Sequence, residues 1–160
     1  SGASESNNLA IKGIAEKYKN RGKHIITTKY EHSSIYGPLS YLQKQGYEVD
    51  FVDANNDGVV DIESLKKLIR EDTILVSICY VDSELGTIQP IKEIGEIIKK
   101  YPNCLFHTDA TQAVGKIKVD FKNCDFVTFS PHKFYGLNGT GVLLNLNNLK
   151  TASCLAVFLI

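Results

Sequence analysis

The chain has 160 residues, the length of one domain with a sizeable hydrophobic core. Its formal net charge is zero and 22% of its residues are charged, so no overall charge draws it toward nucleic acid or an anionic membrane. We therefore expect no direct nucleic-acid binding. The apolar end TASCLAVFLI, 151–160, is too short to span a bilayer, so we expect a final strand there and no membrane attachment.

The N-terminal stretch SGASESNN has no features of a signal peptide and no initiator methionine, and the chain contains no Met at all. We therefore expect a piece of a longer protein. The cysteines, Cys79, Cys104, Cys124 and Cys154, form no Cys-x-x-Cys pair and no His cluster accompanies them, so we expect no metal site. We expect the first three to be buried and reduced, which fits an intracellular compartment.

In chain order, hydrophobic periodicity first predicts a helix within 5–20, where apolar residues recur three and four positions apart. A second helix should begin near residue 37, because Pro38 favours a first helical turn, and should end at Gly46. Asp61 is expected to cap a short third helix, and Pro90 to start a fourth.

Apolar or alternating runs between these helices predict strands. They are expected at 23–28, 47–53, 73–81, 104–109, 124–130 and 141–147. Strands and helices that alternate in this way favour an α/β three-layer sandwich with a mostly parallel sheet. The last of these strands follows its predecessor without a long crossover, so it is expected to be antiparallel.

Polar side chains collect after the predicted strands, at the sheet edge where open α/β sheets bind ligands. Each alone has an ordinary explanation, such as a helix cap, a satisfied histidine or a surface lysine. Together at one edge they predict a site. These residues are His32, Asp82, Ser83, Glu84, Asp109, Gln112, Ser130, His132 and Lys133, with Ala3 and Ser4 at the start of the first helix.

A lysine amine, a carboxylate and a phosphate-binding helix N-terminus together match pyridoxal phosphate chemistry. The lysine forms a Schiff base with the cofactor aldehyde. The carboxylate keeps the pyridine nitrogen protonated, so that the ring acts as an electron sink. Helix amides and hydroxyls bind the phosphate.

Five segments, SGASESNNLAIKG, KHIITTKYEH, DTILVSICYVDSELGTIQPI, HTDATQAVGK and SPHKFYGLNGTG, closely resemble the cysteine desulfurases of the NifS/IscS type. These are class V aminotransferase-like enzymes of the fold-type I pyridoxal phosphate group. The resemblance runs from Ser1 to about Leu146 and implies the large, cofactor-binding domain of that fold.

The resemblance also implies a role for each site residue. Lys133 would be the lysine that binds the cofactor covalently and the general acid and base on the substrate. His32 would stack on the cofactor ring and assist proton transfer. Asp109 would pair with the pyridine nitrogen and Gln112 would contact the phenolic oxygen. The phosphate would be bound by Ala3, Ser4, Ser130 and His132.

The chain departs from the family in two motifs and in extent. It has Asp82-Ser83-Glu84 where the family has Asn-Asn-Glu, and Leu137-Asn138 where Pro-Lys is common. We expect 1–147 to be an incomplete large domain, 148–160 a divergent tail, and the family's C-terminal small domain to be absent. That domain carries the persulfide-forming cysteine, so no cysteine of this chain is given that role.

By this resemblance the full enzyme would convert L-cysteine to L-alanine and pass sulfur, as a persulfide, to an iron–sulfur scaffold or to a tRNA-thiolation acceptor. It would be a homodimer, in either a mitochondrial or a cytoplasmic compartment. Two alternatives stay open. One is a selenocysteine lyase or another class V aminotransferase-like enzyme. The other is a non-catalytic remnant that acts only by association. We expect little desulfurase turnover from the isolated chain.

Overall fold

The computed structural model describes residues 2–146 and the backbone of 153–158. Residue 147 of the last predicted strand and most of the tail assigned to 148–160 lie outside the described residues. The elements, in chain order, are α1 (Ala3–Tyr18), β1 (His24–Thr27), α2 (Ser33–Gln43), β2 (Glu48–Phe51), α3 (Ile62–Leu68), β3 (Thr73–Ser77), α4 (Ile91–Ile98), β4 (Leu105–Asp109), β5 (Phe126–Phe129), the 3-10 turn η1 (Pro131–Phe134), β6 (Thr140–Asn145) and β7 (Ser153–Phe158).

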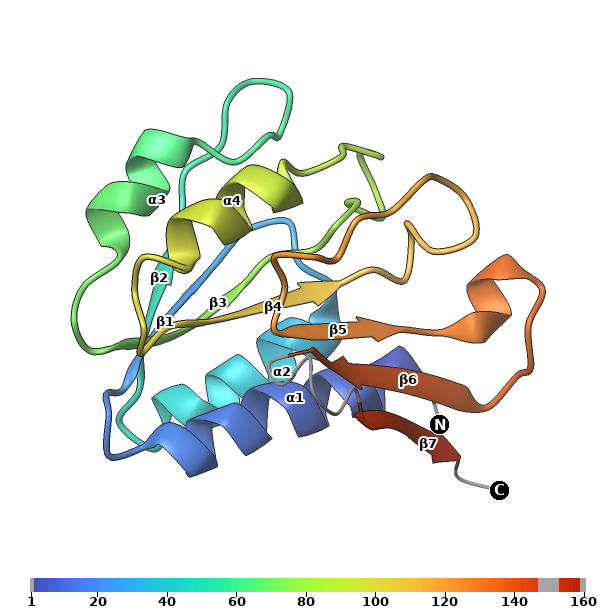
Figure 1. Cartoon of the computed structure of the whole chain (residues 1–160), viewed down its shortest axis with the longest axis horizontal. Helices are drawn as coiled ribbons and strands as arrows, with labels where there is room; N and C mark the ends of the chain where they lie inside the picture. Colours follow the sequence, from blue (N-terminus) through green and yellow to red (C-terminus); the bar gives the residue numbers. More distant parts are fainter. Residues whose placement is uncertain (1, 147–152, 159–160) are drawn as a thin grey trace.

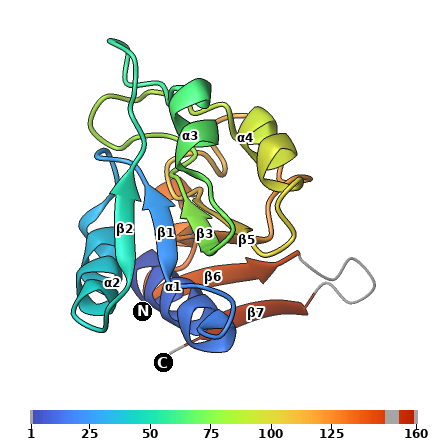
Figure 2. The same cartoon turned by 90° about the vertical axis from the view of Figure 1, so that its left-hand side faces the viewer.

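The described strands form one seven-stranded sheet in the order β2-β1-β3-β4-β5-β6-β7. The strands from β2 to β5 are parallel, whereas β6 is antiparallel to β5 and β7 is antiparallel to β6. Helices α1 and α2 cover one face of the sheet, and α3 and α4 cover the other (Figures 1 and 2). The three-layer α/β sandwich, the antiparallel strand after β5 and the strand in the C-terminal stretch are therefore confirmed.

Each face of the sheet buries its own hydrophobic core. Ile11 and Ile14 of α1 pack with Leu39 of α2 against one face. On the other face, Leu65 of α3 and Ile94 of α4 pack with residues of the central strands. β3 and β4 are buried along their whole length, as expected for parallel strands covered on both sides.

The start of the second helix was predicted wrongly. α2 begins at Ser33, not near residue 37, and Pro38 lies inside it. His32 is the N-cap: its side chain accepts a hydrogen bond from the Ser34 backbone N–H. This cap and the burial of Ile35 start the helix one turn earlier, and Pro38 forgoes only a single backbone hydrogen bond.

The third and fourth helices begin where the sequence predicts them to begin. Asp61 caps α3, accepting hydrogen bonds from the N–H groups of Glu63 and Ser64. Pro90 directly precedes the first residue of α4. The first helix starts slightly earlier than its apolar pattern indicates, at Ala3, with Gly2 as the N-cap.

The strand predicted at 73–81 separates from β1 before its end. Pairing between β1 and β3 stops at Thr27 and Ser77. Beyond that point the backbone N–H of Cys79 donates to the Glu31 carboxyl group, at 2.8 Å. A side chain thus occupies the place of the next β1 residue, and the two neighbouring strands diverge.

The described cysteines Cys79, Cys104 and Cys124 are free and buried, as expected. Among the described residues, no helix combines the length and the apolar character that a membrane crossing requires.

Candidate active site

A cleft of about 490 Å³ opens at the carboxyl edge of the sheet, where β1 and β3 diverge. In the sheet, β2 lies on one side of β1, whereas β3, β4 and β5 follow on its other side. The strand order therefore reverses between β1 and β3, and such a topological switch point is where α/β sheets bind ligands. Every residue to which the resemblance gives a role lines this one cleft, whereas Asp82 and Glu84 do not line it. The residues with such a role are Ala3, Ser4, His32, Asp109, Gln112, Ser130, His132 and Lys133.

One end of the cleft is formed by the N-terminus of α1. The N–H of Ala3 donates to Ser130 Oγ at 2.8 Å, which joins this helix end to the segment after β5. Gly2 has a φ of 114°, in the region that favours glycine, and a Cβ placed there would lie 3.3 Å from Ser130 Oγ. The result is a shallow cradle of backbone N–H groups and hydroxyls, of the kind that binds a phosphate.

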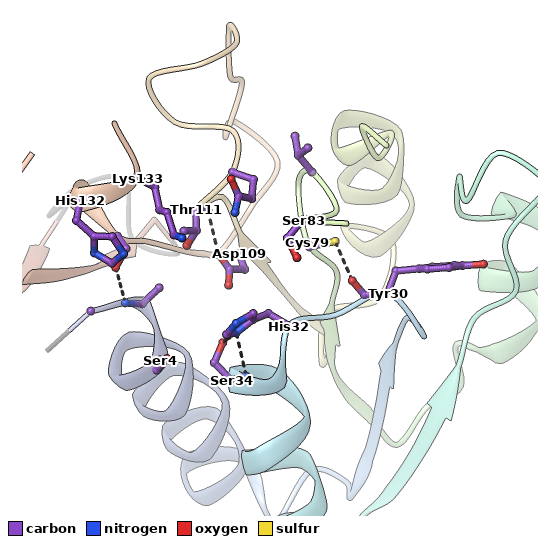
Figure 3. A pocket seen from close by; sticks show the side chains of 15 residues that line it. Ser4, Tyr30, His32, Ser34, Cys79, Ser83, Asp109, Thr111, His132 and Lys133 are labelled. Carbon is purple, nitrogen blue, oxygen red and sulfur yellow. Dashed lines mark hydrogen bonds between the residues drawn. The ribbon is translucent and has the colours of Figure 1, made fainter. Parts of the chain in front are cut away.

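Lys133 lies in η1, the single turn after β5. Its backbone N–H donates to the Ser130 carbonyl oxygen, at 3.2 Å. The turn ends at Tyr135, which has a positive φ of 64°. Figure 3 shows the Lys133 side chain directed toward Asp109 and Thr111, so a ligand in the cleft meets the amine and the carboxylate together.

Asp109, the last residue of β4, is held by two N–H donors. Oδ2 accepts from the Asn7 side-chain amide at 2.7 Å, and Oδ1 accepts from the Thr111 backbone at 2.9 Å. These two hydrogen bonds fix the position of the carboxylate at the end of β4. Next to it, the buried Thr111 Oγ1 has no hydrogen-bond partner among the described residues. An unsatisfied hydroxyl on the wall of a cleft fits a site that receives a polar ligand.

His32 faces Asp109 across the cleft, at the start of α2 (Figure 3). Its Nδ1 lies 3.2 Å from the Ser34 backbone nitrogen and 2.8 Å from Ser34 Oγ. The helix cap therefore fixes the imidazole at one ring nitrogen and leaves Nε2 for the cleft.

A buried acid, Glu31, lies next to the buried thiol of Cys79, which lines the cleft. Glu31 Oε1 accepts from the Thr28 hydroxyl and the Cys79 backbone N–H, whereas Oε2 has no partner among the described residues. Burial raises the pKa of Glu31 to about 8. Burial, with the nearby Glu31 carboxyl as a smaller cause, also raises the pKa of the Cys79 thiol.

Two residues discussed from the sequence lie on the rim. Gln112 Oε1 accepts a hydrogen bond from Lys116 Nζ and lines the cleft. Ser83, at the position of a family Asn, is exposed and also lines the cleft. The preceding Asp82 folds its carboxylate back onto the N–H groups of Glu84 and Leu85.

The sequence reading missed Asn7, Glu31, Ser34 and Thr111. A signal existed for Asn7, because it lies four and seven positions before Ile11 and Ile14 and so shares the apolar face of α1. A polar residue at such a position needs a buried partner. Glu31 and Thr111 gave no comparable signal.

The fold and the cleft define an aminotransferase-like α/β domain. The chain belongs to the aminotransferase class-V family, whose model matches residues 1–153. It is 47% identical over 152 residues to the cysteine desulfurase IscS of Clostridium botulinum strain Hall, a match that covers 94% of this chain and 38% of that protein. Its identity to IscS of Buchnera aphidicola is 50% over 145 residues, covering 89% and 36%.

Comparison with solved structures also finds NifS-like proteins and their relatives. A NifS-like protein superposes with a TM-score of 0.85 at 42% identity, covering 89% of this chain and 40% of the other. DndA from Streptomyces lividans has a TM-score of 0.85 at 33% identity, covering 100% and 46%. The chain therefore spans less than half the length of the relatives that it matches.

Proposed function

We propose that this chain is the cofactor-binding large domain of a pyridoxal phosphate-dependent cysteine desulfurase. The observation that carries the proposal is the meeting of Lys133, Asp109 and the N-terminus of α1 in one cleft. The similarity to proteins named cysteine desulfurase IscS supports this activity over others of the class V family. We also propose that 1–147 forms this domain and that 148–160 diverges from the family.

The residues present fit pyridoxal phosphate. The Gly2 cradle and Ser130 suit the phosphate, with Ser4 and His132 beside them. Asp109, held by two N–H donors, suits the protonated pyridine nitrogen. Lys133 supplies the amine that a cofactor aldehyde requires.

The bound cofactor would supply an electron sink for cleavage of bonds next to the substrate amino group. The residues of this chain would transfer the protons and orient the ring. Lys133 Nζ would take and return protons at the substrate carbon, and His32 would cover the ring and hold a proton at Nε2. Gln112 would orient the ring through its phenolic oxygen.

The sulfur of L-cysteine would pass to a thiolate and leave L-alanine. The described cysteines are unsuitable acceptors, because they are buried and burial raises the pKa of each thiol. We therefore give the persulfide role to no cysteine of this chain, and propose that the sulfur is delivered to an iron–sulfur scaffold or another sulfur acceptor. A homodimer would complete the full-length enzyme. The free cysteines support an intracellular, reducing compartment.

The test is an absorbance scan of the purified chain with pyridoxal phosphate, beside Lys133→Ala. A visible band at roughly 400–430 nm that is absent from the variant and removed by borohydride is the expected result for a lysine-bound cofactor. An identical band in Lys133→Ala would remove the lysine from its proposed role. A folded chain without a band would favour the non-catalytic remnant.

A further inference from the structure

Asn7 is a fully buried polar residue on α1 that contacts three other elements of the fold. Its side-chain Nδ2 donates to Asp109 Oδ2 at 2.7 Å and to Ser34 Oγ at 2.9 Å. Its Oδ1 accepts from the Thr128 hydroxyl. An amide has two N–H donors and one carbonyl, so these contacts satisfy every polar group of the side chain.

The contacts at His32 fix the direction of the hydrogen bonds there. The Ser34 backbone N–H donates to His32 Nδ1, so Nδ1 carries a lone pair. Because Nδ1 is an acceptor, the Ser34 hydroxyl donates its own proton to Nδ1, at 2.8 Å, while its oxygen accepts from Asn7. In a neutral imidazole with Nδ1 as acceptor, the ring proton is on Nε2.

The other side of the network is directed in the same way. Thr128 donates to Asn7 and so accepts from His107 Nε2, at 3.0 Å. His107 Nδ1 then accepts from the Ser77 hydroxyl at 2.9 Å. His107 is neutral in this arrangement, in agreement with burial, which lowers its pKa to about 4.

We propose that Asn7 is a positioning residue that holds Asp109 and His32 as one unit, with Asp109 as a hydrogen-bond acceptor and His32 with its proton on Nε2. The inference deepens the proposed function and rests on it, because it concerns the same cleft. Asn7 contacts Asp109 directly and reaches His32 through Ser34, so one side chain fixes the carboxylate relative to the imidazole. His32 therefore presents an N–H donor to the cleft before any reaction begins.

The tautomer is tested on the cofactor-free chain. Long-range ¹H–¹⁵N correlation of the imidazoles in alkaline buffer distinguishes the two tautomers by their nitrogen shifts, and His32→Gln assigns the signals. We expect His32 to show the Nε2–H pattern. An Nδ1–H pattern in the wild-type chain would overturn the proposal, whether or not the chain binds a cofactor.

The coupling to Asp109 is tested with Asn7→Asp, which keeps the shape but replaces the N–H donors by an oxygen. Asn8→Asp is the matched control, since it adds the same charge one residue along, where the side chain donates a hydrogen bond to the Ser4 carbonyl oxygen. The dissociation constant of pyridoxal phosphate should rise at least about tenfold in Asn7→Asp and change less than about twofold in Asn8→Asp.

A cycle with Asp109→Asn separates positioning from a general loss of structure. In that background Asn7→Asp should change the dissociation constant by less than about threefold, because the carboxylate on which it acts is gone. Equal effects in both backgrounds would contradict the proposal. If Asn7→Asp does not fold, Thr128→Val removes the hydroxyl that donates to Asn7 and accepts from His107. Wild-type affinity for pyridoxal phosphate in that variant would overturn the proposal. If the wild-type chain binds no pyridoxal phosphate, the proposed function is refuted. The imidazole spectrum of the cofactor-free chain would still show whether the Asn7 network sets the His32 tautomer.

Discussion

The N–H of Ala3 donates a 2.8 Å hydrogen bond to Ser130 Oγ, across 127 positions of the sequence. It joins the first residue of α1 to the residue just before the turn that carries Lys133. Behind this contact, Gly141 of β6 packs against the Gly2 carbonyl oxygen. The N-terminus of α1 and the turn that carries the lysine are thus joined by one tertiary contact.

Ser130→Ala should loosen this contact. Removing the hydroxyl leaves the Ala3 N–H without its acceptor, which should lower the free energy of unfolding by about 1 kcal/mol. The affinity for pyridoxal phosphate should fall as well, since the same hydroxyl lines the cradle. Urea unfolding and cofactor titration measure the two effects. Ser40→Ala, at an exposed position of α2, should change neither; unaltered cofactor binding in Ser130→Ala would exclude Ser130 from the cradle.

Gly141→Ala should force β6 away from α1. A Cβ at this position would lie 2.2 Å from the Gly2 carbonyl oxygen and 2.6 Å from Ser6 Oγ. The backbone atom cannot move without disturbing the helix N-terminus, so we expect a loss of about 1–3 kcal/mol in the free energy of unfolding.

Gly13→Ala provides the matched comparison for this substitution. Gly13 lies within α1, and a Cβ there meets nothing within 4 Å. Alanine loses less conformational freedom in a helix, so this variant should gain about 0.5–1 kcal/mol. Thermal unfolding of both variants measures the two changes in stability. A Gly141→Ala chain as stable as the wild type would show that the close approach of β6 to α1 is not required.

Glu31 should make stability fall with rising pH. Its pKa is 4.5 when exposed and about 8 in the folded chain, so the folded state keeps a proton that the unfolded chain releases. Its contribution is fully present below about pH 4.5 and is lost as the pH approaches 8, by at most about 1.4 kcal/mol per pH unit.

The measurement is the free energy of unfolding of the wild-type chain and Glu31→Gln between pH 5 and pH 9. The difference between the two should shift steadily in favour of Glu31→Gln with rising pH, because glutamine does not titrate. Glu63→Gln, at an exposed position, should run parallel to the wild type. A wild-type curve parallel to that of Glu31→Gln would mean that Glu31 is ionised in the fold.

The buried thiols should resist alkylation. Burial raises the pKa of Cys104 and of Cys124 to about 12, and raises that of Cys79 as well, so little thiolate forms at neutral pH. Iodoacetamide labelling, resolved by peptide mass spectrometry, should be at least about tenfold slower in the native chain than in urea. Rapid native labelling of Cys79 would show that the cleft exposes this thiol as a nucleophile.

Much of the fold could be predicted from local patterns. The continuous apolar runs at β3 and β4 and the cap at Asp61 are local signals, and the structure contains them as expected. The second helix begins at Ser33 and not near residue 37, because the cap at His32 outweighs the local preference of Pro38 for a first helical turn. A proline disfavours a helix interior locally, whereas burial of Ile35 and Leu39 depends on the neighbouring layer.

The sequence by itself determined the α/β alternation and the identity of the residues at the strand ends, including Lys133, Asp109 and His32. These follow from periodicity and from motifs that lie within a few residues of one another. Only the tertiary structure decided that Asn7 meets Asp109 and Ser34, and that Glu31 occupies the gap between β1 and β3. Those contacts join segments far apart in the chain. No local sequence pattern indicates which buried polar groups will form hydrogen bonds with one another.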